Sequence, residues 1–113
     1  NKIICVFQPH QAERLARLFG RFQTAFEDAS ISLIAPLYRV LGRDKTNPRF
    51  DSKSLVEAIQ KRYPKQLVFY ISDLKNLKKA LSTLLQTTHY KLPTIIVMMG
   101  AGDIVNYTKN LTT

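Results

Sequence analysis

Four short apolar runs alternate along this chain with segments whose apolar residues recur every three or four positions. The runs cover residues 3–7, 31–35, 67–71 and 94–99, and each has the length of a strand. Uninterrupted apolar runs are typical of strands that are buried on both faces of a parallel sheet. The alternation therefore predicts an α/β fold with three α/β/α layers, in which helices cover both faces of a mainly parallel sheet of about four strands.

The segments between the runs have the features of amphipathic helices. Over residues 11–26 the apolar side chains form one stripe, and three arginines mark the opposite side. The pair Asp51-Ser52 can cap a second helix, and the pair Ser72-Asp73 a third. A last helix is expected over about residues 103–110.

The run at 94–99 is the most apolar of the four, and the most continuously hydrophobic strand is expected at the centre of a parallel sheet. We therefore expect it to lie between the first and second strands. The carboxyl ends of parallel strands meet at one edge of the sheet, which would place His10 beside Gly100 at that edge.

Length and composition indicate one globular domain over residues 1–113, since 45% apolar residues suffice for one core. No apolar run approaches the roughly 20 residues of a membrane helix. We therefore expect a soluble, cytoplasmic protein with no membrane partner, whose isolated domain is a monomer. The single cysteine, Cys5, excludes an intrachain disulfide and favours a reducing compartment.

The chain is strongly basic. Seventeen Lys and Arg residues against eight Asp and Glu give a formal net charge of +9, which favours binding to polyanions such as nucleotides, nucleic acids or anionic head groups. The alternative is that much of this charge lies on a solvated outer face. Residues 36–50 form a long, basic stretch without periodicity, and such loops are often functional or mobile.

His10 and Arg14 stand four residues apart where the first helix is expected to begin. Side chains at this spacing lie on one face of a helix, and the free backbone amides of a helix amino end attract anions. The pair could therefore bind a carboxylate or a phosphate. Alternatively, His10 caps its own helix and Arg14 is only solvated.

The turn Gly100-Ala101-Gly102 follows the last strand. Its glycines permit a positive φ and a close approach of the backbone, which either a ligand or a neighbouring helix could require. The turn lacks the Lys-Ser/Thr ending of a P-loop and the spacing of a dinucleotide fingerprint. No catalytic residue is predicted, because the sequence contains no nucleophile elbow and no cysteine and histidine spaced for covalent catalysis. No metal ligands are predicted either, because two histidines and one cysteine do not make a zinc site. His89 is expected at the surface.

Two strings of residues resemble the Mur ligase family. One is Phe7-Gln8-Pro9-His10, followed by a helix with Arg14 and Leu18-Phe19; the other runs from Met99 to Ile104. In this order they resemble the carboxy-terminal domain of the members that join L-alanine to UDP-N-acetylmuramate. Residues 51–59 are also similar to the beginning of the family's second helix.

The resemblance implies a Rossmann-like domain of a larger enzyme. Family members have three domains, and the third swings in to complete the site. They form an amide bond by hydrolysing ATP through an acyl-phosphate. ATP, Mg²⁺ and UDP-N-acetylmuramate are bound mainly by the other domains, so the resemblance implies that this chain alone holds no cofactor and is inactive.

The resemblance also implies roles for particular residues. His10 and Arg14 match the histidine and arginine that face the incoming amino acid and the lactyl end of the substrate. Gln11 stands where the family usually has another arginine, and Tyr38 stands in the turn after the second strand, where residues 39–45 are basic instead of acidic. The backbone of residues 100–102 is expected to contact a ligand.

Two hypotheses therefore remain. The first is a domain of a muramoyl–alanine ligase of peptidoglycan precursor synthesis, which contributes amino acid binding and domain closure. The second is a non-catalytic, basic Rossmann-like module that binds nucleic acid or another polyanion. The aromatic residues mostly occupy positions expected in the core rather than a platform for stacked bases, which makes nucleic acid the less favoured ligand.

Overall fold

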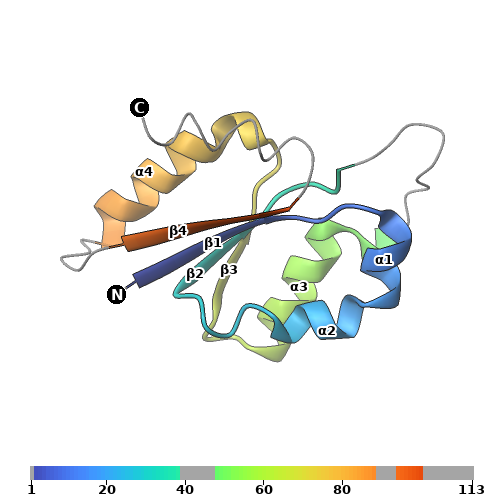
Figure 1. The fold of residues 1–113 in the computed structure, drawn as a ribbon. Coiled ribbons are helices and arrows are strands. Elements are labelled where there is room, and N and C mark those ends of the chain that lie inside the picture. The colour runs from blue at the N-terminus through green and yellow to red at the C-terminus, as the bar shows by residue number, and fades with distance from the viewer. Residues whose placement is uncertain (1, 39–47, 89–93, 101–113) are drawn as a thin grey trace.

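A four-stranded sheet forms the centre of the computed structural model, which describes residues 2–38, 48–88 and 94–100 (Figure 1). The strands are β1 (Lys2–Gln8), β2 (Ile31–Ile34), β3 (Leu67–Tyr70) and β4 (Thr94–Gly100), in the spatial order β3-β2-β1-β4. Each strand is parallel to its neighbour. The predicted bounds of every strand are correct to within one residue.

Helices cover both faces of this sheet, as the alternation of patterns predicted. The helices α1 (Ala12–Arg17), α2 (Phe19–Thr24) and α3 (Ser52–Arg62) lie on one face, and α4 (Leu77–Thr88) lies on the other (Figure 1). Two short 3-10 helices, η1 (Pro48–Phe50) and η2 (Leu74–Asn76), precede α3 and α4. The described residues thus form the three layers of a Rossmann-like fold.

In this sheet β4 is an edge strand, and the expectation that it lies between β1 and β2 is wrong. β2 pairs directly with β1 instead: the amide of Ser30 donates to the carbonyl of Ile3, and the amide of Ala35 donates to the carbonyl of Phe7, both at 2.8 Å. The inner strands are therefore β1 and β2.

The order of the strands explains why α4 covers the opposite face. The chain adds β2 and β3 on one side of β1 and then crosses back to add β4 on the other side. When all crossovers are right-handed, such a reversal moves the connecting helix to the other face of the sheet. The apolar sequence of β4 does not reveal this edge position. In the structure Ile96 and Met98 pack against the core on one face of the strand.

The predicted first helix is divided in two. Leu18 joins α1 to α2 with φ −104° and ψ 15°, which are not helical values. The apolar stripe still packs as predicted, since Leu15 and Phe26 are buried and the ring centroids of Phe22 and Phe7 are 5.4 Å apart. The arginines on the opposite side are exposed.

Two aspartates cap helices, as their positions in the sequence predicted. Asp51 precedes α3, and its Oδ1 accepts a hydrogen bond of 2.8 Å from the amide of Ser54. Asp73 precedes η2, and its Oδ1 accepts one of 2.9 Å from the amide of Lys75. Both carboxylates satisfy amides that the helix itself leaves without a partner.

Each face of the sheet has its own apolar cluster, and β1 contributes to both. On the α4 face the buried members are Ile4, Val6, Ile31, Leu33, Ala35, Ile71, Leu74, Leu77 and Leu81. On the other face, called here the α3 face, they are Cys5, Phe7, Leu15, Phe26, Ile34, Leu55, Val56, Ile59 and Val68. Successive side chains of a strand point to opposite faces, so one apolar run serves both clusters.

Several predicted features lie outside the described residues. They are the last helix at 103–110, most of the basic stretch at 39–47, His89, and the turn residues Ala101 and Gly102.

Candidate functional site

The carboxyl ends of β1, β2 and β4 lie at one edge of the sheet, where the sequence predicted a site. Gln8 lies opposite Gly100 in the pairing of β1 with β4. Beyond β2 the chain continues beside β1, and Tyr38 forms an isolated parallel bridge with His10. The amide of Tyr38 donates to the carbonyl of Pro9 at 2.8 Å. The structure thus brings His10, Tyr38 and Gly100 to one edge.

A buried amide side chain holds two of these strand ends together. Gln8 is only 3% exposed, and its Nε2 donates to the carbonyl of Pro36 at 3.3 Å. This bond connects the end of β1 to the segment after β2, and so positions the turns that carry His10 and Tyr38. The sequence analysis did not assign Gln8 to the site, although an amide at the end of an apolar run was a usable signal.

Gln11 makes the turn between β1 and α1. Gln11 has a φ of 60° and a ψ of 94°. In the described part of the chain it is the only non-glycine residue with a positive φ. Such a conformation is sterically unfavourable for a residue with a side chain, and strained residues cluster at functional sites. Gln11 occupies the N-cap position of α1 without a capping hydrogen bond from its side chain.

His10 lies before α1 rather than within its first turn. Because α1 begins at Ala12 and the Gln11 turn intervenes, the helical spacing that was expected to align His10 with Arg14 does not apply. His10 does not cap the helix either, since Gln11 holds that position. His10 is partly buried and Arg14 is exposed; that the two bind one anion stays a prediction.

Gly100 ends β4 with a φ of 142°. Glycine permits such a positive φ, a region that a Cβ atom disfavours. The other two residues of the turn, Ala101 and Gly102, are outside the described residues. A contact of this backbone with a ligand stays a prediction.

Cys5 lies in β1, where it is paired with Val97 of the neighbouring β4. Its Sγ donates to the Sδ of Met99 at 3.4 Å. Burial raises the pKa of the Cys5 thiol, because an apolar environment disfavours the thiolate. The thiol therefore stays protonated near neutral pH, and a protonated thiol is a poor nucleophile.

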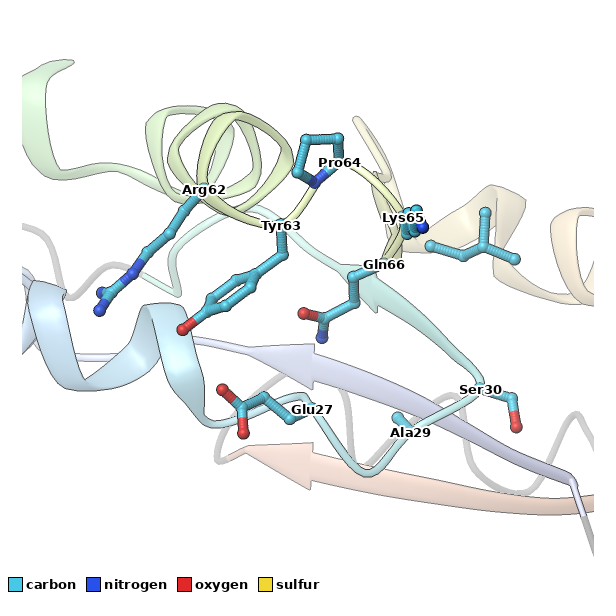
Figure 2. Close-up of a pocket in the computed structure, with 9 residues that line it drawn as sticks. Glu27, Ala29, Ser30, Arg62, Tyr63, Pro64, Lys65 and Gln66 are labelled. Carbon is cyan, nitrogen blue, oxygen red and sulfur yellow. The ribbon is translucent and has the colours of Figure 1, made fainter.

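A concave region lies at the opposite edge, between the turns that precede β2 and β3. This cavity of about 680 Å³ is drawn in Figure 2. The guanidinium carbon of Arg62 is 5.4 Å from the centroid of the Tyr63 ring, and the Nε2 of Gln66 donates to the carbonyl of Phe26 at 2.7 Å. Ligands of open α/β sheets bind at the carboxyl ends of the strands, so we assign the candidate site to the edge with His10.

The described residues contain no group of three His, Cys, Asp or Glu side chains that could hold a metal ion. They also contain no helix long and apolar enough to cross a membrane.

No family model matches the chain, but curated proteins do. The UDP-N-acetylmuramate–L-alanine ligase of Bartonella bacilliformis is 36% identical over 107 residues, which are 95% of this chain and 21% of the relative. The proteins of that name from Synechococcus sp. (strain JA-3-3Ab) and Allorhizobium ampelinum are 34% and 33% identical, over 92% and 95% of this chain and 19% and 21% of theirs.

The chain thus spans about a fifth of the length of these relatives, a share that corresponds to one domain. The matches extend over nearly all of its own length. They confirm the resemblance that the two strings of residues indicated. The chain therefore belongs to the UDP-N-acetylmuramate–L-alanine ligase family, to one domain of which it corresponds.

Proposed function

We propose that residues 1–113 act as the third, carboxy-terminal domain of an ATP-dependent ligase that joins L-alanine to UDP-N-acetylmuramate in peptidoglycan precursor synthesis. The observation that supports this best is the match of ligases with that name over 92–96% of the chain. The structure supports it with a carboxyl edge at which His10, Tyr38 and Gly100 come together.

In this proposal the carboxyl edge binds the amino acid. Arg14 offers an exposed guanidinium on α1, and a guanidinium can pair with a carboxylate through two parallel hydrogen bonds. His10, Gln11 and Tyr38 provide the neighbouring contacts, and the backbone at Gly100 contributes a contact to the anionic end of the substrate. The Gln8–Pro36 hydrogen bond keeps this edge in place.

The domain contributes by closing over the site rather than by chemistry of its own. Closure excludes water from the reacting carboxyl group, which protects an activated substrate from hydrolysis. As the family resemblance implies, we assign ATP, Mg²⁺ and UDP-N-acetylmuramate to other domains of the complete enzyme, and the isolated chain is expected to be inactive.

The test is a kinetic comparison in the full-length enzyme. Arg14→Ala should raise the KM for L-alanine or lower kcat by about tenfold or more, which is about 1.4 kcal/mol of transition-state stabilisation. Arg17→Ala is the matched control, because Arg17 is an exposed arginine of the same helix. Equal kinetics for the two variants would remove Arg14 from the site.

A further inference from the structure

An apolar groove of about 420 Å³ lies between α4 and β3 on the α4 face of the sheet. Leu33 and Ile71, which line it, are buried members of the α4 cluster. The helix contributes the small side chains Ala80 and Thr83, so α4 leaves a hollow beside β3. The lining of the groove is thus largely apolar, and the packing of Leu33 and Ile71 in the core holds part of it in place.

The apolar surface continues beyond the groove along β3. Phe69 and Leu67 are 41% and 47% exposed. They pair in register with Leu33 and Ile31, two residues of the α4 cluster, so they also lie on the α4 face. In a three-layer fold helices normally cover both faces of a parallel sheet, yet α4 leaves these two side chains exposed.

Lysines predominate among the charged residues around the groove. Lys79 is the charged side chain among the described residues that line it. Lys75 and Lys78 are also exposed on this segment, against one nearby carboxylate, Asp73, whose Oδ1 accepts a hydrogen bond from the amide of Lys75. A partner that buries its apolar residues here therefore gains from carboxylates at the border of its apolar stripe.

We propose that the groove between α4 and β3 binds an amphipathic helix of a partner protein, with its apolar stripe against Phe69 and Leu67 and acidic residues beside Lys79. Such a helix lies next to α4 and extends the helical layer over β3, which is a common mode of helix recognition. A second copy of the chain fits less well, because each copy carries a net charge of +9 and brings its own lysines.

The test uses the full-length protein and two synthetic amphipathic helical peptides with the same leucine stripe, one flanked by Glu and one by Lys. In fluorescence anisotropy the Glu peptide should bind at least about tenfold more tightly. Lys79→Glu should reverse this preference. Lys61→Glu changes the net charge equally on α3, which covers the other face, and should keep the preference. Ala80→Trp should fill the groove and abolish binding.

Four results would overturn the proposal. They are the absence of binding by either peptide, equal weakening by Lys79→Glu and Lys61→Glu, binding that survives Ala80→Trp, and a concentration-dependent dimer that Phe69→Lys abolishes. The third result would locate the peptide elsewhere, and the fourth would make a second copy the occupant. Circular dichroism of each variant checks that it folds, and ligase activity should not change, which separates this proposal from the proposed function.

Discussion

At the scale of single residues, the backbone conformation of a glycine determines how its replacement by alanine changes the free energy of unfolding. Gly20 lies in α2, and a Cβ atom added there would meet nothing within 4 Å. Gly100 has a φ of 142°. We predict that Gly20→Ala raises the free energy of unfolding by about 0.5 kcal/mol, while Gly100→Ala lowers it by about 1 kcal/mol or more.

Urea denaturation of the two variants measures both changes. The variants carry the same chemical substitution, so each serves as the control for the other. An unchanged stability of Gly100→Ala would show that the end of β4 can relax to a negative φ, and the turn would then not depend on its glycine.

The residues that the sequence predicted well are those whose partners are local. Asp51 and Asp73 cap helices through amides two or three positions away, and a cap pattern contains that information. The positive φ of Gln11 could not be predicted in this way, because the tertiary structure on both sides of the turn imposes it. The same turn removed the predicted helical alignment of His10 and Arg14.

At the scale of elements, position in the sheet determines how much a strand residue stabilises the fold. Val6 lies in the inner strand β1 and is 0% exposed, whereas Val97 lies in β4 and is 38% exposed. We predict that Val6→Ala lowers the free energy of unfolding by about 2 kcal/mol, and Val97→Ala by less than about 1 kcal/mol. Urea denaturation curves measure the difference in free energy of unfolding between the two variants, and equal slopes make the two values comparable. If the two variants lose equal stability, the exposed face of β4 is covered in solution.

Strand bounds were predictable from sequence because they follow from a local pattern, but strand order was not. The apolar character of β4 predicts burial on both faces. In the structure, Ile95, Val97 and Met99 are exposed and the other face packs against the α4 cluster. The paired strands β1 and β4 lie near opposite ends of the described chain. The hydrophobicity of a strand does not indicate which other strand pairs with it.

At the scale of the whole molecule, the net charge of +9 is compatible with both hypotheses about function, so binding to a polyanion has to separate them. The exposed arginines of α1 and α2 fit a solvated outer face as well as a polyanion site. We predict that the chain shows no saturable binding to random DNA or RNA below about 10 μM at about 0.15 M salt. A salt titration followed by anisotropy measures this. Micromolar binding that falls steeply with salt would favour the polyanion module.

The pairing of β1 with β4 also has a consequence for how the protein forms during synthesis. Cys5 and Met99, which touch across these strands, are 94 positions apart in the chain. On the ribosome, β1 can pair with β2 early in synthesis. Its other side can pair with β4 only after almost the entire domain has emerged. Until then the nascent chain presents an open apolar edge, and such edges promote aggregation, so a pause in translation ahead of Thr94 would be the moment of greatest need for a chaperone.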